Sequence, residues 1–212
     1  YVSADADTDG IFANGDAYAD GIVIHNNSTD SNVTNTGTIT VRSDGDDYAS
    51  ASGIVINGDH YGVVDNAGSI DVAANDYADG IEINGANFGE ITSADMNVTA
   101  FSDATGISAD YNGEDASISN TGTMTVTSND GFAAGIGVYE NFGDIINESG
   151  ATINVDADEV GFGIFSGEDN FGSIVNNGTI TVDAGQAGLG IFGEDNFGLI
   201  DNNGTINVTA DN

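Results

Sequence analysis

Short segments of alternating apolar and polar residues recur along the chain, and Gly, Asn and Asp separate them. The first kind of segment reads Gly-Ile-x-Ile or Gly-Ile-x-Val, as in GIVI at 21–24 and again at 53–56. The second ends in Asn, as in VTN at 33–35, and the third reads Thr-Ile-x-Val, as in TITV at 38–41. Alternation with a period of two predicts β-strands, and the residues between the segments predict turns.

The three segments recur together, as two nearly identical stretches show most clearly. GEDNFGSIVNNGTITV at 167–182 and GEDNFGLIDNNGTINV at 193–208 differ at only three positions. Seven such repeats of about 27 residues, with three short strands each and no helical periodicity, predict a repeat architecture. We therefore expect an all-β, single-stranded, parallel β-solenoid of about seven triangular turns. The preferred chirality of crossovers between parallel strands makes the expected coil right-handed.

Stacked turns place equivalent residues in columns about 4.8 Å apart. We expect an Ile column from the first segment, which includes Ile54 and Ile136, and a Val column from the third, which includes Val72 and Val126. The Asn of the second segment falls two residues after an inward apolar residue, so its amide should point inward and bond along the column. The predicted Asn ladder comprises Asn35, Asn66, Asn120, Asn147, Asn176 and Asn202.

Glycine follows each ladder Asn by two residues in most repeats. We expect these residues to turn the corner with a positive φ, which glycine adopts without steric cost. They are Gly37, Gly68, Gly122, Gly178 and Gly204.

Composition agrees with a single solenoid domain over residues 1–212. The chain contains no Pro, Trp or Cys and has 31 Gly, so disulfides and cysteine-bound metals are excluded. No apolar run approaches the roughly 18 residues of a membrane-spanning helix. Because the sequence starts and stops inside a repeat, we expect it to be part of a longer array, with adjoining repeats or other copies pairing end to end.

The repeated pattern GI…IxNxGTI resembles the passenger regions of bacterial autotransporters, which are surface-exposed β-helical segments of type V secreted proteins. The resemblance extends from Gly10 to Val208. It implies export through the outer membrane, an extracellular or cell-surface location, and a function in adhesion, matrix formation or aggregation. Catalytic passengers of this kind carry their catalytic residues in insertions outside the regular repeat. In this chain the candidate positions are the irregular turn at Ser93 to Met96 and the loop from Val41 to Gly53.

The net charge of the chain limits the kinds of molecule that it can bind. The chain has 35 acidic residues and one Lys or Arg, which gives a formal charge of −34. Nucleic-acid binding is excluded because nothing neutralises phosphates, and direct binding to an anionic membrane is excluded for the same reason. A host-cell or matrix surface remains as a partner.

Acidic residues gather in the loops between the third and the first strand. The simplest interpretation is a solvated face that resists aggregation, and the alternative is a site for hard cations such as calcium, which prefer carboxylate and carbonyl oxygens. The candidate ligands are Asp44, Asp46, Asp47, Asp156, Asp158 and Glu159.

An aromatic residue recurs before a glycine near the second strand. Tyr61, Phe88, Phe142, Phe171 and Phe197 share this position, and Tyr111 lies one residue out of step. These rings are expected to stack along a corner. A carbohydrate platform is the alternative if the rings are exposed.

An enzyme is not expected, although a carbohydrate-active lyase or hydrolase is kept as an alternative. Arg42 is the only strong base. His25 and His60 lie in different turns without an evident Cys or Ser partner and are expected at the surface or in loops. Ice binding is a further alternative, because outward T-x-T pairs recur at Thr38 and Thr40, and also at Thr123 and Thr125 and at Thr179 and Thr181. The expected function is that of an extracellular structural or adhesive stalk, fibre or surface-layer segment with acidic loops.

Overall fold

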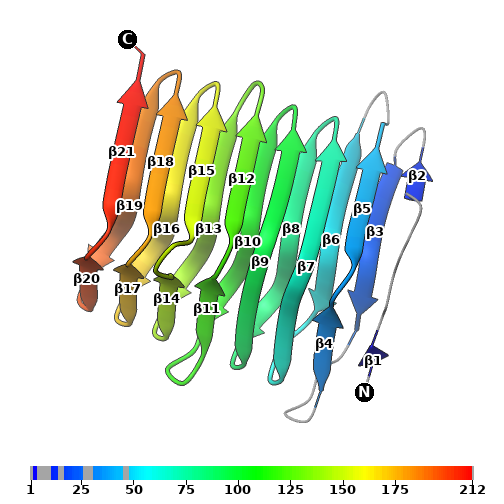
Figure 1. The fold of residues 1–212 in the computed structure, drawn as a ribbon, viewed down its shortest axis with the longest axis horizontal. Coiled ribbons are helices and arrows are strands. Elements are labelled where there is room, and N and C mark those ends of the chain that lie inside the picture. The colour runs from blue at the N-terminus through cyan, green and yellow to red at the C-terminus, as the bar shows by residue number, and fades with distance from the viewer. Residues whose placement is uncertain (1, 4–10, 14–16, 26–30, 45–47, 212) are drawn as a thin grey trace.

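The computed structural model describes residues 2–3, 11–13, 17–25, 31–44 and 48–211. Within these ranges the chain forms strands joined by turns and bends, without any helix, and consequently no helix there is long and apolar enough to cross a membrane. Each strand pairs in parallel with strands of the neighbouring repeats, and the repeats stack into an elongated parallel β-solenoid of about seven turns (Figure 1).

The first segment of each repeat belongs to a seven-stranded sheet. In spatial order its strands are β19 (Ala187–Asn196), β16 (Val160–Asn170), β13 (Phe132–Asn141), β10 (Asp103–Asn112), β8 (Tyr77–Asn87), β6 (Ala49–Asn57) and β3 (Ala17–Ile24).

The second and third segments belong together to a fourteen-stranded sheet. The second segments are β1 (Val2–Ser3), β4 (Asn32–Asn35), β11 (Ser117–Asn120), β14 (Asp144–Asn147), β17 (Ser173–Asn176) and β20 (Leu199–Asn202). The third segments are β2 (Ile11–Ala13), β5 (Thr38–Ser43), β12 (Thr123–Ser128), β15 (Thr152–Ala157), β18 (Thr179–Ala184) and β21 (Thr205–Ala210). In two central turns both segments form one long strand, β7 (Val63–Ala74) and β9 (Glu90–Ala100).

The course of the chain gives the handedness of the coil. In Figure 1 the strands of the near face run upward, those of the far face run downward, and the chain advances from right to left. The coil is therefore right-handed. Its three segments per turn are distributed over two sheets, because β7 and β9 run through both the second and the third segment and so join the two sets of strands into one sheet.

The core lies between the two sheets and includes the predicted columns. Isoleucines of the first segment face valines of the third, and all are at most 7% exposed. One column contains Ile22, Ile54, Ile81, Ile107, Ile136 and Ile164, and the other contains Val41, Val72, Val98, Val126, Val155 and Val182. Full burial of each side chain contributes about 1.5 to 3 kcal/mol, so the stacked columns are the main source of stability.

The corner glycines do not have the predicted positive φ. Among the described residues a positive φ occurs at Gly58, Gly85 and Gly150. The corners require glycine for a different reason, which is the short distance between consecutive turns. A Cβ atom on Gly68 would lie 2.0 Å from the carbonyl oxygen of Gly37, far inside van der Waals contact.

Candidate functional site

The predicted Asn ladder is present at the bend of the fourteen-stranded sheet. The Asn35 amide donates to Asn66 Oδ1 at 2.7 Å, and farther along the Asn147 amide donates to Asn176 Oδ1 at 2.7 Å. The side chains of Asn35, Asn66, Asn120, Asn147 and Asn176 are fully buried, whereas Asn202 in the last turn is exposed. Ser93 stands in the column between Asn66 and Asn120 and accepts from Asn66 at 3.1 Å.

A second amide ladder, which the sequence analysis missed, lies where the strands of the seven-stranded sheet end. The Asn112 amide donates to Asn141 Oδ1 at 2.8 Å, and the Asn141 amide donates to Asn170 Oδ1 at 2.7 Å. Its members are Asn87, Asn112, Asn141, Asn170 and Asn196. The signal was the Asn directly before the Gly or aromatic-Gly pair in five successive repeats, for example in NFG at 141–143.

His60 lies in the loop between β6 and β7, which is one of the two positions expected for the histidines, but it is not at the surface. His25 is exposed, but the His60 side chain is fully buried because it occupies the register of Asn87 in the turn before the second ladder begins. Burial lowers the pKa of the imidazole, although hydrogen bonds to the backbone of Glu90 and Gly62 oppose this effect. A neutral, buried imidazole thus fills the position that Asn occupies in the following turns.

The aromatic column forms a continuous ladder beside the second amide ladder. Ring centroids of Phe142 and Phe171 lie 4.9 Å apart, as do those of Phe171 and Phe197, and both pairs are stacked. Tyr111 is in the ladder despite its sequence offset, 5.1 Å from Phe142. Phe171 is 46% exposed. The rings are thus stacked, as expected, and also exposed in part, so the condition for a carbohydrate platform is met and this alternative stays a prediction.

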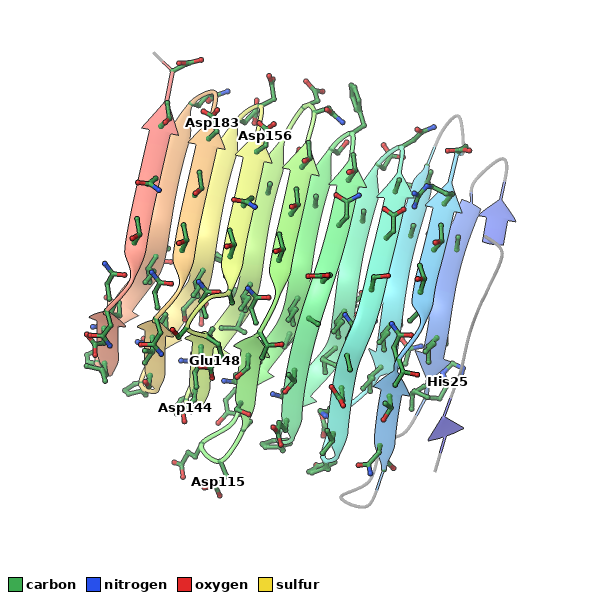
Figure 2. The ribbon with its side chains drawn as sticks, viewed as in Figure 1. His25, Asp115, Asp144, Glu148, Asp156 and Asp183 are labelled. Carbon is green, nitrogen blue, oxygen red and sulfur yellow. The ribbon has the colours of Figure 1, made fainter. Side chains whose placement is uncertain are left out.

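Acidic side chains project from both long edges of the solenoid. Figure 2 shows Asp156 and Asp183 at one edge, within the last residues of β15 and β18, and Asp115 and Asp144 at the opposite edge. Thr127, Asp156 and Asp183 are register neighbours on consecutive turns, so two carboxylates follow one another directly along the axis. This arrangement follows from the strand pairing, which repeats each outward position at the sheet spacing of about 4.8 Å.

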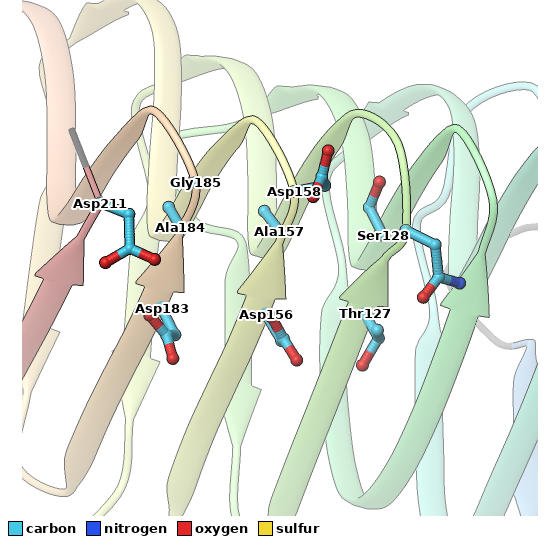
Figure 3. Close-up of a pocket in the computed structure, with 10 residues that line it drawn as sticks. Thr127, Ser128, Asp156, Ala157, Asp158, Asp183, Ala184, Gly185 and Asp211 are labelled. Carbon is cyan, nitrogen blue, oxygen red and sulfur yellow. The ribbon is translucent and has the colours of Figure 1, made fainter.

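These carboxylates border a polar hollow, which we call the acidic corner. It has a volume of about 260 Å³ and is lined by Asp156, Asp158, Asp183 and Asp211 together with small residues of β12, β15 and β18 (Figure 3). Asp183 and Asp211 were not among the predicted ligands. Their participation depends on the register of successive turns.

The predicted cation ligands are only partly brought together. Asp156 and Asp158 line the acidic corner, whereas Glu159 accepts a hydrogen bond from Gln186 outside it at 3.1 Å. Asp44 is exposed near the other end of the solenoid, and Asp46 and Asp47 lie outside the described residues. In the described part of the chain no three acidic, His or Cys side chains converge as metal ligands.

The outward threonines are more regular at one end of the solenoid than the sequence analysis recognised. Strand pairing aligns Thr123, Thr152, Thr179 and Thr205 in one column. In the central turns the same face carries acidic residues instead, and it is hollowed by about 300 Å³ around β7, β9 and β12. The aligned threonines of the last four turns thus form a single column, because Asn154 and Asn207 interrupt the neighbouring column of Thr125 and Thr181.

Arg42, the strong base considered for lyase chemistry, is occupied by an ion pair. Its guanidinium donates to the Asp71 carboxylate and, at 2.9 Å each, to the carbonyl oxygens of Val41 and Asp71. A cation held in this way cannot abstract a proton.

Among the carboxyl groups of the described residues, Asp79 has the largest pKa shift. Its pKa is raised to about 7 by burial and by the neighbouring charge of Glu82.

Comparisons with protein families, with curated proteins and with solved structures found no match to this chain. Its function must therefore be argued from its geometry.

Proposed function

We propose that this chain is an extracellular structural segment, the repeated shaft of a surface stalk or fibre comparable to an autotransporter passenger. The observation that supports the proposal is the continuity of its columns. The aliphatic core runs from turn to turn, and the two amide ladders and the aromatic ladder join most turns to the next, with an interruption of the first amide ladder at Ser93. Such a rod transmits force along its axis and keeps its ends a fixed distance apart.

The outer surface suits exposure to water and to ions. Acidic side chains occupy both long edges, and a formal charge of −34 keeps neighbouring rods apart through mutual repulsion. Contact along the axis is favoured instead, because β19, β20 and β21 each have a paired strand on one side only within the described residues. We propose that adjoining repeats, or another copy of the chain, continue these sheets and that the outer edges face a host-cell or matrix surface.

The test is immunogold electron microscopy of the source cells with an antibody raised against the folded protein. Intact cells should carry label on their surface, displaced outward from the membrane by the length of the stalk. An antibody against an internal protein, which must label only permeabilised cells, controls for leakage. Label that requires permeabilisation would overturn the proposed location and with it the stalk.

Ice binding is a second candidate, favoured by the aligned threonine column of the last four turns. Regularly spaced hydroxyl and methyl groups on a flat face can order water. Thermal hysteresis of the purified protein tests this candidate, and the variant Thr179→Tyr with Thr181→Tyr should abolish it. No measurable hysteresis in the unmodified protein removes the candidate.

A further inference from the structure

A narrow apolar groove crosses the outer surface of the seven-stranded sheet, away from both amide ladders. It has a volume of about 180 Å³ and is lined by residues of β10, β13 and β16, among them Thr105, Ser108, Phe132, Tyr139 and Phe165. Apolar atoms provide nearly all of its exposed surface. None of the columns described above extends into this groove.

Gly137 leaves the groove open. It pairs in register with Ser108 on one side and with Phe165 on the other, so its outward position has no side chain next to a large ring. An added Cβ would meet its nearest neighbour, a methyl carbon of Thr105, at 3.6 Å, which is ordinary contact. The fold therefore does not require glycine here, unlike at Gly135, where an added Cβ would lie 2.3 Å from Ile153.

Glycine inside a strand is unfavourable unless something else needs the space. It weakens the strand by roughly 0.5 to 1 kcal/mol relative to alanine, and it often marks the approach of a ligand. Gly137 opens the floor of a groove that already has aromatic walls, and these two features together indicate a binding site.

The two flanks of the groove differ in chemistry. On one side Phe132 and Phe165 present rings at 71° to each other with centroids 6.0 Å apart, and the Tyr139 hydroxyl donates to the Glu168 carboxylate. On the other side the next strand places carboxylates beside the groove-lining hydroxyl residues. Strand pairing aligns Glu82 with Ser108 and Asp79 with Thr105.

The carboxylate flank lacks a positive partner among the described residues. Glu82 accepts a hydrogen bond from the Ser52 hydroxyl at 3.0 Å. The raised pKa of Asp79 reflects burial first and then the charges of Glu82 and Asp103 nearby. Arg42, the one strong cation of the chain, is bound to Asp71 on the other sheet. A positive charge at this place must therefore come from another molecule.

The size of the groove limits what it can hold. Pockets for small molecules begin at roughly 300 Å³, so 180 Å³ suits a single side chain rather than a sugar chain. A long cationic side chain matches both flanks, because its methylene stem packs on apolar surface while its charged head reaches a carboxylate. Arginine fits better than lysine, since a planar guanidinium also stacks on aromatic rings.

We propose that the groove over Gly137 binds an arginine side chain of a basic polypeptide, with its stem against Phe165 and its guanidinium directed toward Glu82 and Asp79. The partner is complementary to the formal charge of −34, which attracts basic chains over a distance and makes binding dependent on salt. This binding site does not depend on whether the chain serves as a stalk.

The experiment uses a synthetic peptide, acetyl-Ser-Gly-Arg-Leu-Arg-Gly-Ser-amide, titrated into the full 212-residue chain. Sodium chloride at roughly 0.3 M suppresses diffuse attraction to the acidic surface. Backbone amide shifts in nuclear magnetic resonance spectra locate the binding, and they should be largest in β10, β13 and β16. The same peptide with citrulline in place of arginine keeps the shape and removes the charge, and it should bind at least about tenfold more weakly, which is about 1.4 kcal/mol.

Variants separate the groove from the general charge of the protein. Gly137→Leu should fill the groove and weaken binding at least tenfold, and Glu82→Gln should weaken it severalfold while leaving the core untouched. Phe171→Ala removes an exposed ring from the aromatic ladder, and Asp183→Asn removes a charge from the acidic corner, so these matched controls should bind as the unmodified chain does. Melting curves check that every variant is folded. If Gly137→Leu does not fold, Glu82→Gln still tests the proposal.

Three results would overturn the proposal. The first is equal loss of binding in the groove variants and in the controls, which would mean diffuse attraction. The second is equal binding of the arginine and citrulline peptides. The third is a set of groove shifts that a neutral oligosaccharide such as cellohexaose produces and the arginine peptide does not, which would assign the groove to a carbohydrate.

Discussion

At the scale of single residues, buried Asn side chains form the hydrogen bonds that connect one turn to the next. An Asn side chain that donates to one neighbour and accepts from the other satisfies its polar groups without water. Where Ser93 replaces Asn in the first ladder, this relay is interrupted. Asn120 Oδ1 is the buried side-chain atom that lacks a hydrogen-bond partner among the described residues, because the shorter serine does not carry an amide to donate to it.

Ser93→Asn should therefore stabilise the protein. The new amide would donate to Asn120 Oδ1 and restore a hydrogen bond worth about 1 kcal/mol in the free energy of unfolding. Urea denaturation followed by circular dichroism measures the change. The control is Ser119→Asn, at an outward position of the neighbouring turn, which should change stability by less than about 0.5 kcal/mol. If both variants behave alike, the unpaired oxygen has no energetic importance.

Asp79 makes stability dependent on pH in the direction opposite to that of most carboxyl groups in folded proteins. Its pKa in the folded chain is about 7, above the value of 3.8 for a free side chain, because burial and Glu82 disfavour the charge. The folded state therefore binds the proton more tightly than the unfolded state, and the contribution of Asp79 to stability decreases as the pH rises from about 4 to about 7.

Asp79→Asn should remove this dependence. The full shift corresponds to about 4 kcal/mol, and because part of the side chain meets solvent we expect about 1 to 2 kcal/mol of added stability at pH 8. Near pH 4 the variant and the unmodified protein should agree within about 0.5 kcal/mol. Denaturation at both pH values provides the measurement, and an equal difference at the two would show that the carboxyl group does not titrate as described.

At the scale of strands, glycine sets the distance between turns and between the two sheets. The glycine that opens the first segment of each repeat lies against the opposite sheet and the next turn. At Gly163 an added Cβ would lie 2.3 Å from Ile180 Cγ2 and 2.4 Å from the carbonyl oxygen of Gly190. The repeated Gly-Ile pair is thus a spacing requirement, whereas Gly137 in the groove is not.

Gly163→Ala and Gly137→Ala should consequently have opposite effects. The first forces a methyl group into contact with backbone and should lower stability by about 1 to 3 kcal/mol. The second adds a methyl group at ordinary contact distance from its neighbours and should raise stability by about 0.5 to 1 kcal/mol. Chemical denaturation of the two variants in parallel decides, and a loss of stability at Gly137 comparable to that at Gly163 would contradict the distinction.

The strands, the two core columns and the first ladder could be predicted because a period of two within a repeat specifies which side chains point inward. The second ladder escaped because the strands of the seven-stranded sheet extend to Asn141 and its equivalents, well beyond the four-residue motif that revealed them. Neither the role of Gly137 nor the burial of Asp79 could be inferred, since both depend on which outward side chains stand beside them in neighbouring turns.

At the scale of the whole molecule, stacking holds like charges close together that the unfolded chain can separate. Register neighbours such as Asp156 and Asp183 follow one another along the axis, and a repulsion of roughly 1 kcal/mol per pair in water opposes folding. Counter-charge must come from the solution, because Arg42 is the only strong cation of the chain and is already paired.

Salt should therefore raise the melting temperature. We expect sodium chloride near 0.5 M, where the Debye length is about 4 Å, to stabilise the protein as much as calcium does at matched ionic strength. The reason is that no three ligands converge in the described part of the chain. The measurement is a melting series in chelator, in sodium chloride and in calcium. A rise specific to millimolar calcium would instead support chelation by the acidic loops, including Asp44 and Asp156.

The ion pair of Arg42 also determines how the protein meets digestive enzymes. Trypsin cleaves after Lys or Arg, and within these 212 residues that leaves one bond, the one after Arg42. The guanidinium that the protease must draw into its specificity pocket is held by Asp71 and by two carbonyl oxygens, inside strand β5 of a continuous sheet. The folded shaft therefore presents trypsin-like proteases with no accessible cleavage site in its described residues, and it can persist where such enzymes degrade its neighbours.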